Sequence, residues 1–360
     1  MSFTSINIIN EASIRGDYFI NSTECERRAL VVTFTERGNI DLVGTGFGGD
    51  FLLSQGCDVV AIKTTASRWF EDLNNEMVTR IIEELYYRGR SYSFRASYGS
   101  SMGGYAAIRF SKDLRIDRVL AISPLYSIFL DEDRRYSEDG ALLSQLEMMK
   151  PEFIGKETNF FVVYDPFSKD KIHIDRFKKI IGGEKFHLLE VPFSGHPSGL
   201  VLNEIGQLKE VGSRVLLDGV FPSLRSVLNR RRYSPTYLYC LGEALNRHHK
   251  YKWATAVLIR ASEINPRSAE IFTQLTIAHL GTTNTKEALF AAMTSVELDF
   301  GNVHRRLNLL DVLERTEMFQ QAIALIDKML CDVANNPDNA SRQHYQYRRE
   351  CVLAKMRKSR

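Results

Sequence analysis

The sequence predicts an α/β fold with a mostly parallel sheet in the first two-thirds of the chain, followed by an all-helical repeat region. Two observations support this division of the 360 residues. Up to about residue 200, short β-branched and aromatic runs alternate with helical patterns, which is typical of an α/β sheet. After about residue 233 the strand signals stop and apolar residues recur with a period of 34, which indicates stacked helical hairpins.

Eight segments have the composition of strands. Several are continuous apolar runs, such as ALVVTF and RVLAI, which indicates strands that are buried on both faces of a parallel sheet. The predicted strands are Ser5–Asn10, Asp17–Ile20, Ala29–Phe34, Asp58–Ile62, Ser91–Ser97, Arg118–Ile122, Asn159–Tyr164 and Lys185–Val191. Helices predicted at Phe51–Gln55, Glu71–Tyr87 and Met102–Ser111 would form crossovers between parallel strands. The segment Leu125–Phe153 has no strand signal and many charges, so we predict a cap over the sheet there.

The period of 34 begins at Pro235. Apolar and small residues of the first unit recur in two further, progressively weaker units, and they include Leu238, Gly242, Ala254 and Leu258, then Leu275, Ala288 and Ala292, then Leu309, Ala322 and Ile326. This pattern resembles the tetratricopeptide repeat, whose helix pairs bury their apolar stripes by stacking on neighbours. We expect residues 1–212 to form the α/β domain, 213–234 a linker, and 235–360 three repeats plus a capping helix.

The stretch SYSFRASYGSSMGGYAAIR, from Ser91 to Arg109, contains the motif Gly99-Ser100-Ser101-Met102-Gly103 between a predicted strand and a predicted helix. A Gly-x-Ser-x-Gly motif in this context exposes the serine hydroxyl at the tip of a sharp turn. Ser101 is therefore the candidate nucleophile. The turn also places the backbone N–H of Met102 at a helix N-terminus, where it can donate to an oxyanion.

A serine nucleophile needs a histidine base within hydrogen-bond reach. Five of the eight histidines lie in the helical repeats, and His187 lies inside a predicted strand. His173 lies in the same segment as the candidate acids and is not excluded by its position. His196 follows the last predicted strand in the loop VPFSGHPSG, and we predict that it is the base.

The third group should be a carboxylate that fixes the histidine tautomer. Two aspartates compete in the segment that follows the strand NFFVVY. Asp165 ends that strand directly and is also placed to cap the turn at Pro166. Asp170 lies several residues further on, where it can reach across to His196. We favour Asp170 and keep Asp165 as the alternative.

The order of serine, aspartate and histidine, one after each of three strands, resembles that of the α/β-hydrolase superfamily. The resemblance covers the first 200 residues and implies a serine hydrolase acting on ester bonds. In it, ALVVTFTERG corresponds to the third strand and the following loop, so the amides of Thr35 and Glu36 would complete the oxyanion hole. The family's usual His-Gly dipeptide is absent there. The combination of domains suggests modification of bacterial envelope or capsule glycans as one context.

Aromatic residues near the expected mouth of the site, Trp69, Tyr98 and Tyr126, are candidates for a substrate pocket. The substrate would be an ester or an acylated compound, and acyl transfer to a glycan or to a protein-linked hydroxyl would use the same groups. The alternative is a non-catalytic scaffold with a relic hydrolase domain, because helical repeats of this kind present a protein-binding face.

Composition and residue spacing also bear on nucleic-acid binding, membrane insertion, cofactors and cellular location. The 47 basic and 44 acidic residues nearly balance, which gives no indication of nucleic-acid binding. No stretch of 18 apolar residues is available to span a membrane, and no ligand spacing predicts a metal or an organic cofactor. Five scattered cysteines and the lack of a signal-peptide pattern favour a cytoplasmic protein. A protein partner is expected to bind through the repeats.

Overall fold

A computed structural model of the chain describes residues 3–22, 28–143, 149–334 and 339–358. The chain separates into two compact units, Met1–Arg231 and Arg232–Arg360. Each unit has its own buried apolar clusters.

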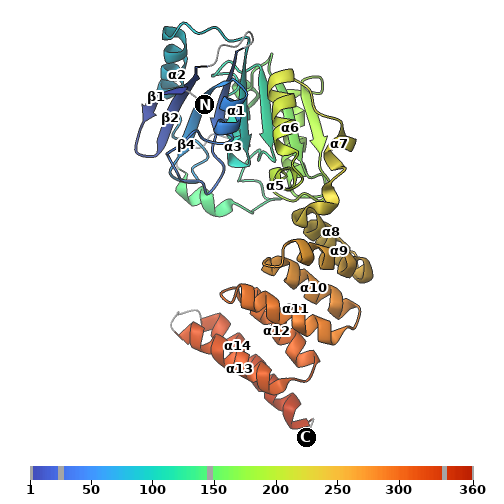
Figure 1. Ribbon diagram of the computed structural model, residues 1–360. Coiled ribbons are helices and arrows are strands. Elements are labelled where there is room, and N and C mark those ends of the chain that lie inside the picture. The colour runs from blue at the N-terminus through green and yellow to red at the C-terminus, as the bar shows by residue number, and fades with distance from the viewer. Residues whose placement is uncertain (1–2, 23–27, 144–148, 335–338, 359–360) are drawn as a thin grey trace. The chain divides into compact units, whose positions relative to one another are not determined.

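The first unit is built on a sheet of eight strands in the part of the chain that the structure describes (Figure 1). The strands are β1 (Phe3–Asn10), β2 (Ile14–Asn21), β3 (Ala29–Phe34), β4 (Asp58–Thr64), β5 (Phe94–Ser100), β6 (Arg118–Ile122), β7 (Asn159–Tyr164) and β8 (Phe186–Glu190). They lie in the order β1-β2-β4-β3-β5-β6-β7-β8. Only β2 runs against both of its neighbours, and the strands from β4 to β8 are parallel. This is the strand order of the α/β-hydrolase fold, so the predicted fold class is confirmed.

Helices cover both faces of this sheet. The helices of the first unit are α1 (Gly49–Ser54), α2 (Asn75–Tyr87), α3 (Met102–Arg109), α4 (Asp170–Ile181), α5 (Gly199–Glu204), α6 (Leu208–Ser213) and α7 (Leu224–Leu228). One large apolar cluster joins α2, α3 and α4 to alternate residues of the strands, such as Leu30 and Val32. Residues between them, such as Val31, are also buried, because α1 and α6 lie over the opposite face (Figure 1). Burial on both faces explains why these strands are apolar throughout.

Several element boundaries differ from the sequence prediction by a few residues, and two of the differences have a clear physical reason. Strand β5 was expected at Ser91–Ser97 but continues to Ser100, because Gly99 and Ser100 pair with β6 although neither is a strong strand former. Helix α2 was expected from Glu71 but begins at Asn75. The Asn74 side chain caps it by accepting the amide of Met77 at 2.9 Å.

The predicted cap, Leu125–Phe153, contains two short 3₁₀ helices, η1 (Ser137–Leu142) and η2 (Pro151–Phe153), and its described parts include no strand. Residues 144–148 of this cap lie outside the described residues.

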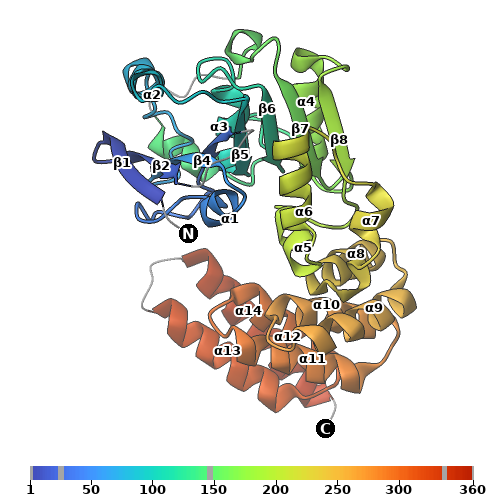
Figure 2. The ribbon, with the colours of Figure 1, turned by 45° about the horizontal axis from the view of Figure 1, so that its top comes forward.

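The second unit is helical throughout its described residues, which confirms the helical prediction for the last third of the chain. Its helices are α8 (Pro235–Arg247), α9 (Tyr251–Ile264), α10 (Ala269–Gly281), α11 (Thr285–Leu298), α12 (Val303–Arg315), α13 (Phe319–Ala334) and α14 (Asn339–Lys358). Each packs against the next along the chain (Figure 2). Helices α8, α10 and α12 begin at residues 235, 269 and 303, which are 34 residues apart, and the helices α9, α11 and α13 repeat at the same interval.

Candidate active site

Ser101 lies at a sharp turn between β5 and α3, at the carboxyl edge of the sheet. Its backbone has φ 53° and ψ −114°, a conformation that residues other than glycine rarely adopt. A Cβ at Gly99 would come within 2.2 Å of the carbonyl oxygen of Gly103, and a Cβ at Gly103 within 2.4 Å of the carbonyl oxygen of Phe34. The Gly-x-Ser-x-Gly spacing is therefore a steric requirement of this turn.

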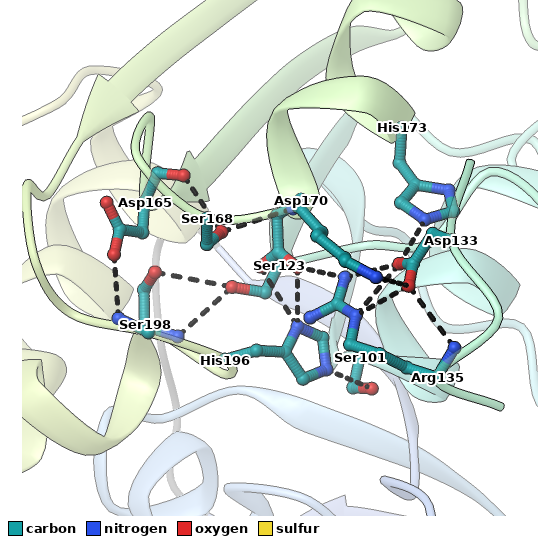
Figure 3. A network of polar contacts seen from close by, with 12 residues as sticks. Ser101, Ser123, Asp133, Arg135, Asp165, Ser168, Asp170, His173, His196 and Ser198 are labelled. Carbon is teal, nitrogen blue, oxygen red and sulfur yellow. Dashed lines mark hydrogen bonds and ion pairs between the residues drawn. The ribbon is translucent and has the colours of Figure 1, made fainter. Parts of the chain in front are cut away.

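The Ser101 hydroxyl, His196 and Asp170 form a continuous hydrogen-bonded series (Figure 3). Ser101 Oγ lies 2.8 Å from His196 Nε2, and His196 Nδ1 lies 2.9 Å from Asp170 Oδ2 and 3.0 Å from Oδ1. An ionised carboxylate only accepts hydrogen bonds, so Nδ1 carries the ring proton and donates a hydrogen bond to Asp170. Nε2 is then free to accept the hydrogen bond of the Ser101 hydroxyl.

The two aspartates that the sequence left open have different surroundings. Asp165, at the end of β7, accepts three backbone amides, those of Phe167, Phe193 and Gly195, at 2.9, 3.1 and 2.8 Å. Burial raises the pKa of Asp165 above its ordinary value. Burial acts in the same direction on Asp170, but hydrogen bonds from His196 and Arg135 outweigh it and hold the pKa of Asp170 below its ordinary value. The structure thus places Asp170 against the His196 ring, and Asp165 under the loop that carries this ring.

Three buried serines also hold the His196 loop, and sequence reasoning did not identify them. The amide of Ser198 donates to Ser123 Oγ at 3.0 Å. The hydroxyl of Ser194 donates to the carbonyl oxygen of Val191 at 2.7 Å, and its Oγ also lies 2.7 Å from Ser198 Oγ. Small hydroxyl residues are common throughout the sequence, so no signal separates these three from the others.

The candidate oxyanion donors lie where β3 and the start of α3 meet. The amide of Met102 belongs to the first turn of α3, whose N–H groups have no acceptor within the helix. The amide of Thr35 donates to the carbonyl oxygen of Ile62 at 3.3 Å, so it is engaged in extending the sheet. The amide of Glu36 has no acceptor among the described residues. Of the three amides, those of Met102 and Glu36 remain available for an oxyanion.

Two of the three predicted pocket aromatics have contacts that tie them to the surrounding framework. Tyr98 is buried on β5, with its ring centroid 4.7 Å from that of Phe47. Burial raises the pKa of the Tyr98 hydroxyl, and the nearby charge of Glu36 adds to this. The hydroxyl of Tyr126 donates to the carbonyl oxygen of Met149 at 3.0 Å. Tyr98 therefore borders the candidate oxyanion loop, whereas Tyr126 supports the cap.

The third aromatic, Trp69, is buried and anchors the cap. Its Nε1 donates to Asp139 Oδ2 at 2.9 Å, and Arg37 donates to both oxygens of the same carboxylate at 2.7 and 2.8 Å. Between these anchors and His196 lies Tyr136, whose ring centroid is 5.8 Å from that of His196 and 5.1 Å from the Arg37 guanidinium carbon. The structure thus brings the aromatic ring of Tyr136 next to the candidate base, His196.

Sequence reasoning missed Tyr136 and its charged neighbours. The run DEDRR marks this segment as polar, yet the spacing does not distinguish residues that fold inward from those that face solvent. The side chain of Arg134 is 73% exposed, and that of the next residue, Arg135, is 25% exposed and contacts Asp170.

Comparisons with known proteins give only distant likenesses. No family model matches the sequence, and no curated protein matches it. Among solved structures, the capsule O-acetyltransferase of Neisseria meningitidis serogroup A is 13% identical, with a TM-score of 0.41, over 58% of this chain and 93% of its own. Carboxyl esterase 2 of the fungus Tuber melanosporum is 13% identical, with a TM-score of 0.38, over 54% of this chain and 77% of its own. The type III secretion translocator chaperone of Yersinia enterocolitica is 13% identical, with a TM-score of 0.30, over 39% of this chain and 92% of its own.

The described part of the chain contains no helix that is long and apolar enough to cross a membrane. In the same residues, no group of three or more His, Cys, Asp or Glu side chains is arranged to hold a metal ion.

Proposed function

We propose that this protein is a serine hydrolase that cleaves ester bonds, with Ser101 as nucleophile, His196 as general base and Asp170 as the acid that orients it. The single observation that carries the proposal is the hydrogen-bonded series from Ser101 Oγ through both nitrogens of His196 to Asp170. It occurs on a strained strand-to-helix turn, and backbone strain of this kind clusters at active sites.

The reaction follows from this geometry. As Ser101 Oγ attacks the ester carbonyl carbon, its proton moves to His196 Nε2, and the resulting imidazolium is stabilised by the Asp170 carboxylate. The amides of Met102 and Glu36 would donate to the oxygen that becomes negatively charged. His196 then returns the proton to the leaving alcohol as the carbon–oxygen ester bond breaks, which leaves an acyl group on Ser101.

A second hydroxyl group completes the cycle. Attack by water on the acyl-enzyme gives hydrolysis, whereas attack by a hydroxyl of a glycan or of a protein-linked acceptor gives acyl transfer. Both reactions use His196 in the same two roles, so the geometry of the triad is compatible with either.

Turnover of p-nitrophenyl esters of increasing acyl length tests the proposal. We expect the wild type to hydrolyse the short esters and Ser101→Ala to lower turnover by about 10⁶-fold. Addition of mono- and oligosaccharides, with mass spectrometry of the products, separates hydrolysis from transfer. Equal rates for the wild type and Ser101→Ala across all esters would contradict an enzymatic role and favour the non-catalytic scaffold.

For the second unit we propose a tetratricopeptide-like repeat array that binds a protein partner, with residues 1–212, 213–234 and 235–360 as catalytic domain, linker and array. The repeat of helix starts every 34 residues supports this proposal. So does the recurrence of the same N-cap position, since Ser234, Ser268 and Asn302 each accept an amide of the following helix. We also propose a cytoplasmic location, in keeping with the scattered cysteines.

A cavity of about 510 Å³ in the second unit indicates the chemistry of the partner. It lies between the α8–α9 and α10–α11 turns, and Lys250, Lys252 and Trp253 contribute to its lining. Neither lysine forms an ion pair with an acidic side chain of the described residues, and Trp253 is 71% exposed. These features favour an acidic peptide segment.

Titration of the full chain with poly-L-glutamate, followed by tryptophan fluorescence, tests this partner class. We expect saturable quenching that weakens with salt and that is lost in a Lys250→Ala, Lys252→Ala variant. The exposed Lys286 provides a matched control substitution. Quenching that persists in the double variant would contradict this binding site.

A further inference from the structure

An arginine from the cap reaches the carboxylate that faces the base. Arg135 Nη2 donates to Asp170 Oδ1 at 2.9 Å, and Asp170 Oδ1 also lies 3.0 Å from His196 Nδ1 (Figure 3). The Asp170 side chain is completely buried. A buried carboxylate pays a large desolvation cost, and each charged or polar donor that contacts it offsets part of that cost.

The position of Arg135 is itself fixed by a second aspartate. Asp133 Oδ2 accepts from both Nε and Nη2 of Arg135, at 2.8 and 2.6 Å, and its Oδ1 lies 2.9 Å from Nε. Such a two-point contact between guanidinium and carboxylate is geometrically specific. Arg135 therefore approaches Asp170 in one defined orientation.

Asp133 also contacts α4, the helix that carries Asp170. His173, three residues further along this helix, lies with Nε2 at 3.0 Å from Asp133 Oδ2. Its Nδ1 accepts a hydrogen bond from the amide of Tyr126 at 3.0 Å. The ring proton is therefore on Nε2, which donates a hydrogen bond to Asp133. Burial lowers the pKa of His173 below its ordinary value, which keeps the ring neutral. One turn of α4 is thus attached to the cap by three hydrogen bonds, one of Asp170 and two of His173.

We propose that Arg135 is a positioning residue of the triad, and that the attachment of the cap through Arg135 holds the Asp170 carboxylate in the plane in which it accepts from His196. This inference rests on the proposed function and deepens it. Because the donor comes from the cap, the arrangement of the triad depends on the cap being in place. Arg135 acts through Asp170 and has no contact with Ser101 among the described residues.

The charged and polar groups around Asp170 determine the pKa of its carboxyl group. These are His196 in the loop after β8, Arg135, Asp133 and Tyr136 in the cap, Asp165 at the end of β7, and His173 on α4. Burial acts to raise the pKa of Asp170, and the contacts with His196 and Arg135 lower it. Removal of the arginine therefore raises this pKa. Loss of the ionised form, and of the activity that needs it, then begins at a higher pH on the acid side.

The experiment compares the full-length wild type with Arg135→Gln, Arg135→Lys and the control Arg134→Gln. Arg134 pairs with Asp131 at the surface, and both side chains are more than 70% exposed, so its substitution leaves the network intact. Three quantities are measured for each protein after circular dichroism has shown that it is folded. They are kcat/KM on a short p-nitrophenyl ester, the pH dependence of kcat/KM, and the far-downfield proton resonance of the hydrogen bond from His196 Nδ1 to Asp170.

We expect Arg135→Gln to lower kcat/KM by roughly 10- to 100-fold, the size of effect that a small misplacement of a catalytic group produces. Its acid limb should move to higher pH and its downfield resonance should weaken. Arg135→Lys keeps the charge but loses the two-point geometry, so it should fall between Arg135→Gln and the wild type. Arg134→Gln should match the wild type in all three quantities.

A folded Arg135→Gln variant with wild-type kcat/KM, pH profile and resonance would overturn the inference. Where Arg135→Gln does not fold, wild-type values for Arg135→Lys would overturn it. Failure of the proposed function gives a different result, because the wild type then shows no turnover that depends on Ser101. In that case the resonance decides the positioning role of Arg135 alone, since it needs no substrate.

Discussion

Gly103, the second residue of α3, lies against the end of β3, so that a Cβ there would stand 2.4 Å from the carbonyl oxygen of Phe34. This close approach brings the first amides of α3 to the loop that begins at Thr35. The same contact therefore shapes both the turn that carries Ser101 and the candidate oxyanion site.

Gly103→Ala should abolish most activity, because the added methyl group forces α3 away from β3 and moves the Met102 amide. Overpacking of this kind typically costs about 1–3 kcal/mol of stability. Urea unfolding and ester turnover measure the two effects. Gly183→Ala is the control, since nothing lies within 4 Å of a Cβ at Gly183. Wild-type turnover in Gly103→Ala would show that the contact has no role in the site.

Asn substitutions of the two aspartates should differ in their effect on kcat. Asp170→Asn should lower kcat by roughly 10⁴-fold, because the amide no longer fixes the productive tautomer of His196, and it should also lower stability, because it removes the buried partner of Arg135. Asp165→Asn should cost about 1 kcal/mol, because its amide nitrogen cannot accept the N–H of Gly195, and should lower kcat far less. Steady-state kinetics and urea unfolding of both variants measure these profiles. A larger loss of kcat in Asp165→Asn than in Asp170→Asn would make Asp165 the acid of the triad.

Acid should weaken the attachment of the cap through Asp139. Burial acts to raise the pKa of Asp139. Hydrogen bonds from Arg37 and Trp69 outweigh this effect, so the pKa of Asp139 lies below its ordinary value. The folded state thus favours the ionised form. The resulting stability is present above the unfolded-state pKa of about 4 and is lost as the pH falls through the lower folded value.

Unfolding of a Trp253→Phe background, followed by Trp69 fluorescence, measures this dependence within the first unit. The sequence has two tryptophans, so Trp69 alone then reports. We expect Asp139→Asn to flatten the loss of stability below pH 4, and Asp131→Asn, whose side chain is 90% exposed, to leave it unchanged. The same acid dependence in Asp139→Asn and its background would refute this assignment.

The sequence was sufficient to predict the eight strands, because burial on both faces makes runs such as ALVVTF apolar at every position. It also led to Ser101 and His196 as candidates, since each follows a strand at the carboxyl edge of the sheet, and the structure brings their side chains within hydrogen-bond distance. It did not separate Asp165 from Asp170. That distinction depends on which carboxylate receives backbone amides and which receives a ring nitrogen, and both contacts come from a loop some 30 residues away in the chain.

The charged contacts of the cap were beyond prediction for a similar reason. Arg37 and Asp139 are 102 residues apart, and Arg135 and Asp170 are 35 apart. Nothing in the local pattern distinguishes these charges from solvated ones. Only the packing of the cap on α4 and on the loop after β3 brings them together.

Covalent labelling with a fluorophosphonate probe tests the central claim most directly, because the probe reacts only with an activated serine. The wild type, Ser101→Ala, His196→Ala and the neighbouring control Ser100→Ala are treated alike, and the modified peptide is located by mass spectrometry. We predict a label on Ser101 in the wild type and in Ser100→Ala, and its loss in the other two variants. A folded wild type that takes up no label, or takes it up at another serine, would contradict the account.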